Sequence, residues 1–337
     1  MAAHLAILEY PYVVLMLEPI KPPYAYSLAF LFPGPGATSM GLSAIKPLYN
    51  ACPPLRAALD QADKLMLPSG LKPSRVCFVG PEEDLLKPSI SGPVMLALSQ
   101  GLVETLRQRR IKPQMVLGHG FGEVAALVAA GVLSYPDGLA FLRQRGEIIE
   151  EAWSRHPYYA LTLSGLALPA LEQELAGMAE APLLVAVNSP DHLTLAGDPG
   201  LLESMAKHLA DGRRVKASAV QPGMAWPHPS LEEASQQVEA AFRELKLERC
   251  GGLEIISAAT GGFVGRVEDL PGLQALGCHQ LLRFDLALAA LLARGANTLV
   301  SLVNGAPGAW ARRINSGVRA LSCEDAHSMG QTLKMAF

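Results

Sequence analysis

The chain has 337 residues, of which 50% are hydrophobic and 18% charged, a composition typical of a globular protein and not of a disordered one. Its formal net charge of −3 argues against a nucleic-acid-binding protein. A chain of about 300 residues buries roughly three quarters of its unfolded surface, which is enough for a large domain carrying a smaller one.

The cysteines and histidines show no ligand or disulfide spacing, so we expect no metal site and a reducing, cytoplasmic location. An apolar stretch at 5–17 is interrupted by Glu9 and Pro11 and is shorter than the ~20 residues of a membrane span. We therefore expect no membrane association. Residues 1–27 are interpreted as an added arm, which is either a docking segment or an extension without a role.

Strands and helices alternate along the first half of the chain, which is typical of a parallel sheet covered by helices. A strand is predicted at 26–32, directly before a turn rich in proline and glycine at 33–36. The elements predicted next are a helix at 93–108, a buried strand at 114–117, an alanine-rich helix at 123–132 and an amphipathic helix at 135–153.

The order of predicted strands and helices changes in the middle of the chain. The elements predicted there are a strand at 158–166, a helix at 168–178, strands at 183–187 and 192–196, a helix at 201–209 and a strand at 214–220. This β-α-β-β-α-β order is the ferredoxin-like split unit. The α/β pattern then resumes with a helix at 230–245, a strand at 253–257, a helix at 285–292 and a strand at 298–303.

The sequence therefore predicts an α/β fold with two parts. The first is an α/β-hydrolase-like parallel-sheet domain formed by two segments, 28–156 and 223–337. The second is a ferredoxin-like subdomain at 157–222, inserted between them after the N-terminal arm at 1–27.

One motif in the first half lacks its reactive residue. Residues 118–122 read Gly-His-Gly-Phe-Gly, between an apolar run and a helix-like run. This is the strand–turn–helix context of the nucleophile elbow G-x-S-x-G. The serine position holds Gly120, which offers no attacking atom. Glycine is the residue that the strained, positive-φ turn of an elbow accommodates most easily.

Further motifs follow one another along about residues 28–320 in a specific order and spacing. They are 32–36, 118–123, 125–133, 145–147, 187–190 and His228. In these motifs the chain resembles the malonyl-CoA:acyl carrier protein acyltransferases, which load extender units in fatty-acid and polyketide synthesis.

The resemblance implies a ping-pong acyl transfer. A serine takes the acyl group from CoA, a histidine acts as base, and the acyl group passes to the phosphopantetheine thiol of a carrier protein. The base corresponds to His228, and the remaining oxyanion N–H belongs to Phe121. Without the serine, a packed or solvent-facing His228 fits equally well. By analogy, a backbone carbonyl near Arg283 would orient this histidine.

Arg145 corresponds to the family's arginine that pairs with the malonyl carboxylate, because it follows Gly120 by 25 residues. A bidentate guanidinium–carboxylate pair explains why arginine is used there. The alternative is an ordinary helix-surface arginine beside Arg143 and Glu147.

Two further positions depart from the family pattern. Pro35 replaces a glutamine whose backbone N–H donates to the oxyanion, and proline has no N–H. Loss of one such donor typically lowers the rate by roughly 10²–10³. A proline that only tightens the loop would still leave the donor absent. Gly92 replaces a glutamine that in the family lies near the active site.

Three more residues belong to the expected substrate-binding region. His119 and Asn188 lie in matching motifs, and for His119 a packing role is favoured. Trp226 stands in the tetrapeptide that ends in the histidine. With Pro227 it matches neither the malonyl nor the methylmalonyl pattern, so no acyl preference is assigned.

We therefore hypothesise an acyltransferase-like pseudoenzyme of polyketide or fatty-acid biosynthesis that no longer transfers acyl groups covalently. It would bind an acyl carrier protein, a synthase subunit or an acyl-CoA, and it would need no cofactor of its own. One alternative is an active transacylase in which Gly120 has replaced a natural serine, or a weak acyl hydrolase. Another is a purely structural partner of a synthase.

Overall fold

The computed structural model describes residues 27–34, 36, 42–210, 215–224 and 226–334. The predicted N-terminal arm lies outside these residues except for Ser27, and so does Pro35. Within the described residues, no helix is both long and apolar enough to cross a membrane.

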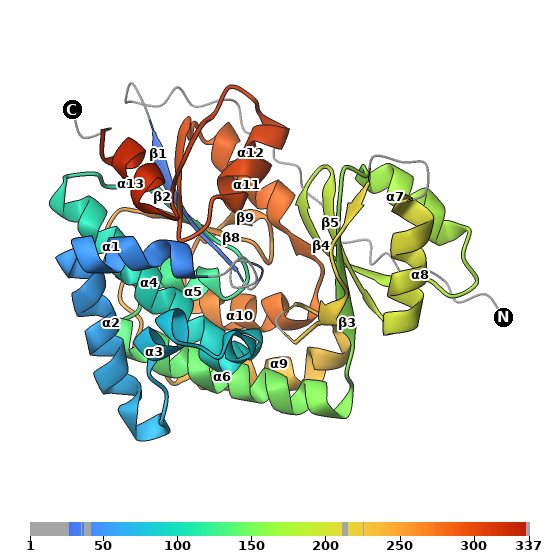
Figure 1. Ribbon diagram of the computed structural model, residues 1–337, viewed down its shortest axis with the longest axis horizontal. Coiled ribbons are helices and arrows are strands. Elements are labelled where there is room, and N and C mark those ends of the chain that lie inside the picture. Colours follow the sequence, from blue (N-terminus) through green and yellow to red (C-terminus); the bar gives the residue numbers. More distant parts are fainter. Residues whose placement is uncertain (1–26, 35, 37–41, 211–214, 225, 335–337) are drawn as a thin grey trace.

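A six-stranded sheet forms the centre of the larger part (Figure 1), in the order β12-β11-β1-β2-β8-β9. Its strands are β1 (Leu28–Phe32), β2 (Met115–Gly118), β8 (Glu254–Ser257), β9 (Gly262–Phe263), β11 (Thr298–Leu302) and β12 (Arg319–Cys323). All neighbours pair in parallel except β9, which is antiparallel to β8. Every residue of β1 and β2 is buried, as expected where helices cover both faces of a parallel sheet.

Helices surround this sheet. The α-helices are α1 (Lys46–Ala51), α2 (Pro53–Met66), α3 (Pro73–Phe78), α4 (Pro88–Gln108), α5 (Gly122–Ala129), α6 (Tyr135–Arg155), α9 (Glu232–Arg243), α10 (Leu270–His279), α11 (Phe284–Ala293), α12 (Ala306–Ile314) and α13 (Ala326–Leu333). The 3-10 helices are η2 (Ser43–Ile45), η3 (Leu67–Ser69), η4 (Glu82–Leu86), η5 (Pro229–Leu231) and η6 (Val267–Asp269). A Cβ at Gly146 would lie 2.1 Å from the Ser89 nitrogen, so glycine allows α6 to cross α4 closely.

A second sheet has the order β10-β4-β5-β3-β6, with β7 also paired to β3. Its strands are β3 (Tyr159–Ser164), β4 (Leu183–Ser189), β5 (His192–Gly197), β6 (Lys216–Ala217), β7 (Gln221–Pro222) and β10 (Leu282–Arg283). Helices α7 (Leu168–Ala176) and α8 (Pro199–Ala210) lie on one side of it in Figure 1. A separate cluster of buried apolar side chains, including Leu161, Leu195 and Leu209, forms its core.

The predicted fold class is confirmed: an α/β parallel-sheet domain carries a ferredoxin-like unit in β-α-β-β-α-β order. The unit differs in one respect, because β10 joins its sheet in parallel beside β4. This strand lies far along the chain and ties the two parts together. The predicted boundaries at 157 and 222 stay a prediction.

Several element boundaries differ from the expected ones. The helix expected at 93–108 begins at Pro88 and contains Pro93 in its interior. Pro88 fits the first turn because the N–H groups there have no partner within a helix. Of the strand expected at 214–220, the described residues 215–220 contain only the short strand β6, and a second short strand, β7, follows at Gln221–Pro222.

Candidate functional site

The elbow turn joins β2 to α5. Gly120 has a φ of 55°, so the positive φ expected there is present. The Glu123 N–H donates to the Gly120 carbonyl at 3.0 Å, which begins the helix. Glycines flank the turn because side chains would not fit: a Cβ at Gly118 would lie 2.2 Å from the Glu123 nitrogen, and one at Gly122 2.5 Å from the Pro33 oxygen.

Phe121 directly precedes α5 and presents its backbone N–H at the helix N-terminus. In the part of the chain that the structure describes, this N–H has no hydrogen-bond acceptor. It is therefore available to an acceptor oxygen, and the helix dipole favours negative charge there. The second expected donor position, Pro35, lies outside the described residues.

His119 is almost fully buried at the elbow, with 2% of its surface exposed. Its Nε2 is 2.7 Å from Oδ1 of Asn188 on β4. Burial lowers the pKa of His119 to about 4, so the ring is neutral near pH 7. A Cβ at Gly34 would lie 2.1 Å from its Nδ1, so the loop after β1 approaches the ring closely. This tight packing matches the role favoured from the sequence.

Three aromatic side chains surround the His119 ring. The ring centroid of Phe284 is 4.8 Å away, that of Trp310 5.5 Å and that of Trp226 5.6 Å. Sequence reasoning identified Trp226 but missed Phe284 and Trp310. The available signal was weak, because the two residues lie on α11 and α12, far along the chain from the elbow.

Arg145 lies on the inner side of α6 with 7% of its surface exposed, so the helix-surface alternative is wrong. Its Nη2 is 3.7 Å from Sγ of Cys278, and its Nε has no partner. It forms no ion pair with an acidic side chain of the described residues. A buried guanidinium in this state carries a large desolvation cost and favours an anion as ligand.

Glu123 is the acidic group that interacts electrostatically with Arg145. Its carboxyl accepts from Ser257 Oγ at 2.8 Å and from the Ala258 N–H at 2.6 Å. Burial raises the pKa of Glu123, while these hydrogen bonds oppose the shift. Gln274 Nε2 also donates to it at 3.3 Å, so Glu123 links α5, β8 and α10.

His228 lies just before η5, and its backbone N–H donates to the Cys278 carbonyl at 3.0 Å. Its ring stacks on Tyr158, with centroids 4.1 Å apart and planes inclined by 14°. The Ser230 N–H donates to Nδ1 at 3.2 Å, and Ser230 Oγ lies 2.8 Å from the same atom. Among the described residues, Nδ1 thus pairs with Ser230 and not with a carbonyl near Arg283.

The structure therefore gathers the expected residues in two neighbouring groups. Asn188 and Trp226 both contact the His119 ring, next to Gly120 in the chain, whereas Arg145 and His228 both contact Cys278. Tyr158 connects the groups, because it stacks on His228 and its hydroxyl donates to the Trp226 carbonyl.

Gly92 lies on α4 against α6, where a Cβ would be 3.3 Å from Cβ of Leu142. Leu142 precedes Arg145 by three residues on α6, so position 92 is about one helical turn from the arginine. Glycine here permits close helix packing, a role that the sequence reading did not include.

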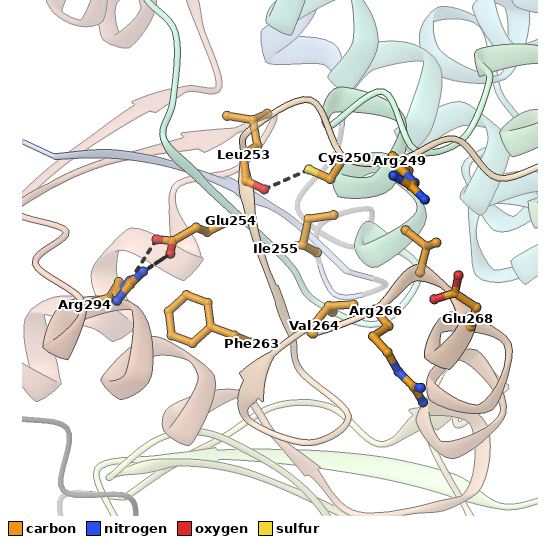
Figure 2. Close-up of a pocket in the computed structure, with 12 residues that line it drawn as sticks. Arg249, Cys250, Leu253, Glu254, Ile255, Phe263, Val264, Arg266, Glu268 and Arg294 are labelled. Carbon is orange, nitrogen blue, oxygen red and sulfur yellow. Dashed lines mark hydrogen bonds and ion pairs between the residues drawn. The ribbon is translucent and has the colours of Figure 1, made fainter.

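A groove of about 660 Å³ lies apart from these residues, at the β8–β9 edge of the large sheet (Figure 2). Leu253, Ile255, Phe263, Val264 and Val267 supply apolar side chains to it. Its Arg294 is paired with Glu254, with Nε 2.8 Å from Oε1. None of the residues predicted for the functional site lines this groove.

Comparison with known proteins matches residues 29–258 to the acyl transferase domain family. A malonyl CoA-acyl carrier protein transacylase of Bacillus subtilis is 24% identical over 314 residues, covering 91% of this chain and 97% of that protein. The mycoketide-CoA synthase of Mycobacterium tuberculosis is 28% identical over 245 residues, covering 70% of this chain but 6% of the synthase.

Solved structures share the fold. The malonyl-CoA:acyl carrier protein transacylase of Xanthomonas oryzae superposes with a TM-score of 0.81 at 21% identity, covering 92% of this chain and 98% of that one. A malonyl-transacylase solved in complex with a type II polyketide synthase acyl-carrier protein gives a TM-score of 0.79 at 20% identity, covering 92% and 99% of the two chains.

Proposed function

Since the chain belongs to the acyl transferase domain family, we propose that it is a transacylase-like protein that binds acyl thioesters without covalent transfer. Its ligands would be an acyl-CoA or the acylated phosphopantetheine of a carrier protein, in polyketide or fatty-acid biosynthesis. The relatives named above support this choice, because they include a malonyl CoA-acyl carrier protein transacylase and a transacylase–carrier complex.

The observation that carries the proposal is Gly120 at the apex of the elbow. The backbone turn is kept, with a φ of 55°, and no side chain is present to form an acyl-enzyme. The neighbouring His119 does not replace the serine, since its Nε2 is paired with Asn188 and the ring is enclosed by aromatic side chains. Transfer through a covalent intermediate therefore lacks its nucleophile.

Retained binding is supported by Arg145. Its buried guanidinium has an unpartnered Nε and a thiol, a weak acceptor, at Nη2. A carboxylate of the ligand would satisfy both the charge and the free donor. We therefore propose an acyl group with a terminal carboxylate, of which malonyl is the smallest family example, and a role of the protein in holding or handing over this thioester.

A second candidate is an active transacylase in which glycine has replaced the natural serine. The observation that favours it is the retained elbow geometry, because a serine would need the same turn. The variant Gly120→Ser separates the two candidates. Robust loading of a carrier protein by this variant would favour the second, whereas continued inactivity would implicate Pro35 as well.

Equilibrium binding of malonyl-CoA, acetyl-CoA and CoA tests the proposal. We expect malonyl-CoA to bind most tightly and to be recovered unchanged after the measurement. Rapid turnover of malonyl-CoA to CoA by the unaltered chain, or the absence of thioester binding to both CoA and carrier-protein forms, would contradict it. A carrier protein loaded with a malonyl group is the matched second ligand.

A further inference from the structure

His228 has a hydrogen-bonding arrangement that differs from that of a general base. A backbone N–H can only donate, so the Ser230 N–H at 3.2 Å requires a lone pair on Nδ1. In a neutral imidazole, one nitrogen accepts and the other carries the proton. The proton of neutral His228 therefore resides on Nε2.

The surroundings keep the ring neutral and fixed. Burial lowers the pKa of His228, and no acidic side chain contributes to holding a charge on it. The Tyr158 ring covers one face at 4.1 Å, and the hydroxyl of Tyr158 is anchored to the Trp226 carbonyl. A Cβ at Gly223 would lie 2.3 Å from the Tyr158 ring, so the tyrosine has little room to move.

The chain segment that carries His228 passes beside the elbow. Trp226, two residues earlier, contacts the His119 ring and lies 3.9 Å from where a Cβ of Gly36 would be, in the loop after β1. Within the described residues, Nε2 has no hydrogen-bond partner, and the ring is half-buried. A hydrogen-bond donor is thus left without a partner among the described residues, in the segment next to the elbow.

We propose that His228 donates a hydrogen bond from Nε2 to the carbonyl oxygen of a bound thioester, with the Ser230 backbone fixing this tautomer. A neutral histidine that acts as a donor to a carbonyl is an established arrangement in enzymes. The inference rests on the proposed function only in that the ligand is a thioester. Because Nε2 already carries a proton, it does not accept one from an attacking thiol or hydroxyl.

The tautomer is measured directly by long-range ¹H–¹⁵N correlation NMR on protein labelled at histidine. The His228 signals are identified by their loss in His228→Gln. We expect a neutral ring with its proton on Nε2 near neutral pH. A proton on Nδ1, or on both nitrogens, would overturn the proposal. No ligand is needed, so this outcome is independent of the proposed function.

A binding series tests the role of the donor. Glutamine can place its amide N–H₂ near the position of Nε2, whereas asparagine is too short. We expect His228→Asn to weaken acetyl-CoA binding about 2- to 10-fold, the effect of one neutral hydrogen bond, and His228→Gln to weaken it less. The control ligand is S-ethyl-CoA, a thioether without the carbonyl, for which the two variants should be equal. Equal losses for thioester and thioether would contradict the proposal.

If no thioester binds at all, the proposed function fails, while the NMR result still decides where the proton resides.

Discussion

The guanidinium of Arg145 contacts the thiol of Cys278, with Nη2 3.7 Å from Sγ. The two residues come from α6 and α10, and both are buried. The Cys278 thiol itself donates to the Gln274 carbonyl at 3.3 Å, so it satisfies little of the arginine's capacity. Under the proposed function, a carboxylate would bind at this contact, and the main-chain bond from His228 to Cys278 brings the second expected site residue to the same point.

Replacing Arg145 by glutamine should separate two otherwise similar ligands. We expect Arg145→Gln to weaken malonyl-CoA binding about 10- to 100-fold, as for the loss of a hydrogen bond to a charged group. Acetyl-CoA, which has no carboxylate, should lose about 2-fold at most. Isothermal titration calorimetry measures both. The matched control is Arg155→Gln on the same helix, where the arginine is exposed and paired with Glu151. Equal losses for the two ligands would argue against carboxylate binding by Arg145.

An internal carboxylate at position 278 should compete with the ligand. In Cys278→Asp the new side chain would pair with the Arg145 guanidinium, so malonyl-CoA affinity should fall to that of acetyl-CoA. Cys278→Ser supplies a neutral group of similar size and should keep the preference for malonyl-CoA. Both variants are first compared with the unaltered chain by thermal unfolding. A preserved malonyl preference in folded Cys278→Asp would count against the assigned anion position.

Adding a side chain at the elbow turn should lower the stability of the folded protein. At a φ of 55°, Gly120→Ala should lower the free energy of unfolding by about 1–2 kcal/mol, the cost of the left-handed region for an L-residue. Gly277→Ala is the control, since this glycine lies in α10 with nothing within 4 Å of the added Cβ. It should raise the free energy of unfolding by roughly 0.5–1 kcal/mol. Urea unfolding gives both values. A Gly120→Ala protein as stable as the unaltered chain would show that a side chain at position 120 causes no backbone strain.

Stability should depend on pH through His119. Its pKa is lowered to about 4 in the folded protein, against about 6.5 when unfolded. The unfolded chain therefore binds the proton first, and stability falls as pH drops from about 6.5 to about 4. Between about pH 7 and pH 5 the loss should be about 2 kcal/mol. Urea unfolding at both pH values is compared with His119→Gln, which removes this titration. The same loss in the variant would assign the effect to other groups.

The sequence predicted the fold and the elbow well, for a physical reason. Both depend on local patterns: a buried strand, glycines where backbones approach, and alternating strands and helices. Gly118 and Gly122 illustrate this, because their close contacts involve the adjoining helix start and the neighbouring strand end. The β-α-β-β-α-β order of the elements from β3 to β6 could likewise be predicted from the spacing of short apolar runs.

The rest of the site depended on contacts between distant segments. Cys278 could be recognised as part of the site only from its contact with Arg145, which lies 133 residues away in the sequence. Tyr158 could be recognised only from its stacking on His228. The pairing of Nδ1 with Ser230 is local, yet it could be recognised only once the ring orientation was known. Sequence spacing carries no information on such orientations, so the resemblance implied a base role for His228 while a packed or solvent-facing histidine stayed an equal alternative.

The most direct measurement of the central claim is intact-mass spectrometry after incubation with malonyl-CoA. The account predicts that the unaltered chain keeps its mass while malonyl-CoA binding is detectable under the same conditions. Gly120→Ser, alone and combined with Pro35→Gln, shows whether the assay detects an acyl-enzyme when nucleophile and donor are restored. A stable malonyl adduct on the unaltered chain, with Gly120 in place, would contradict the account.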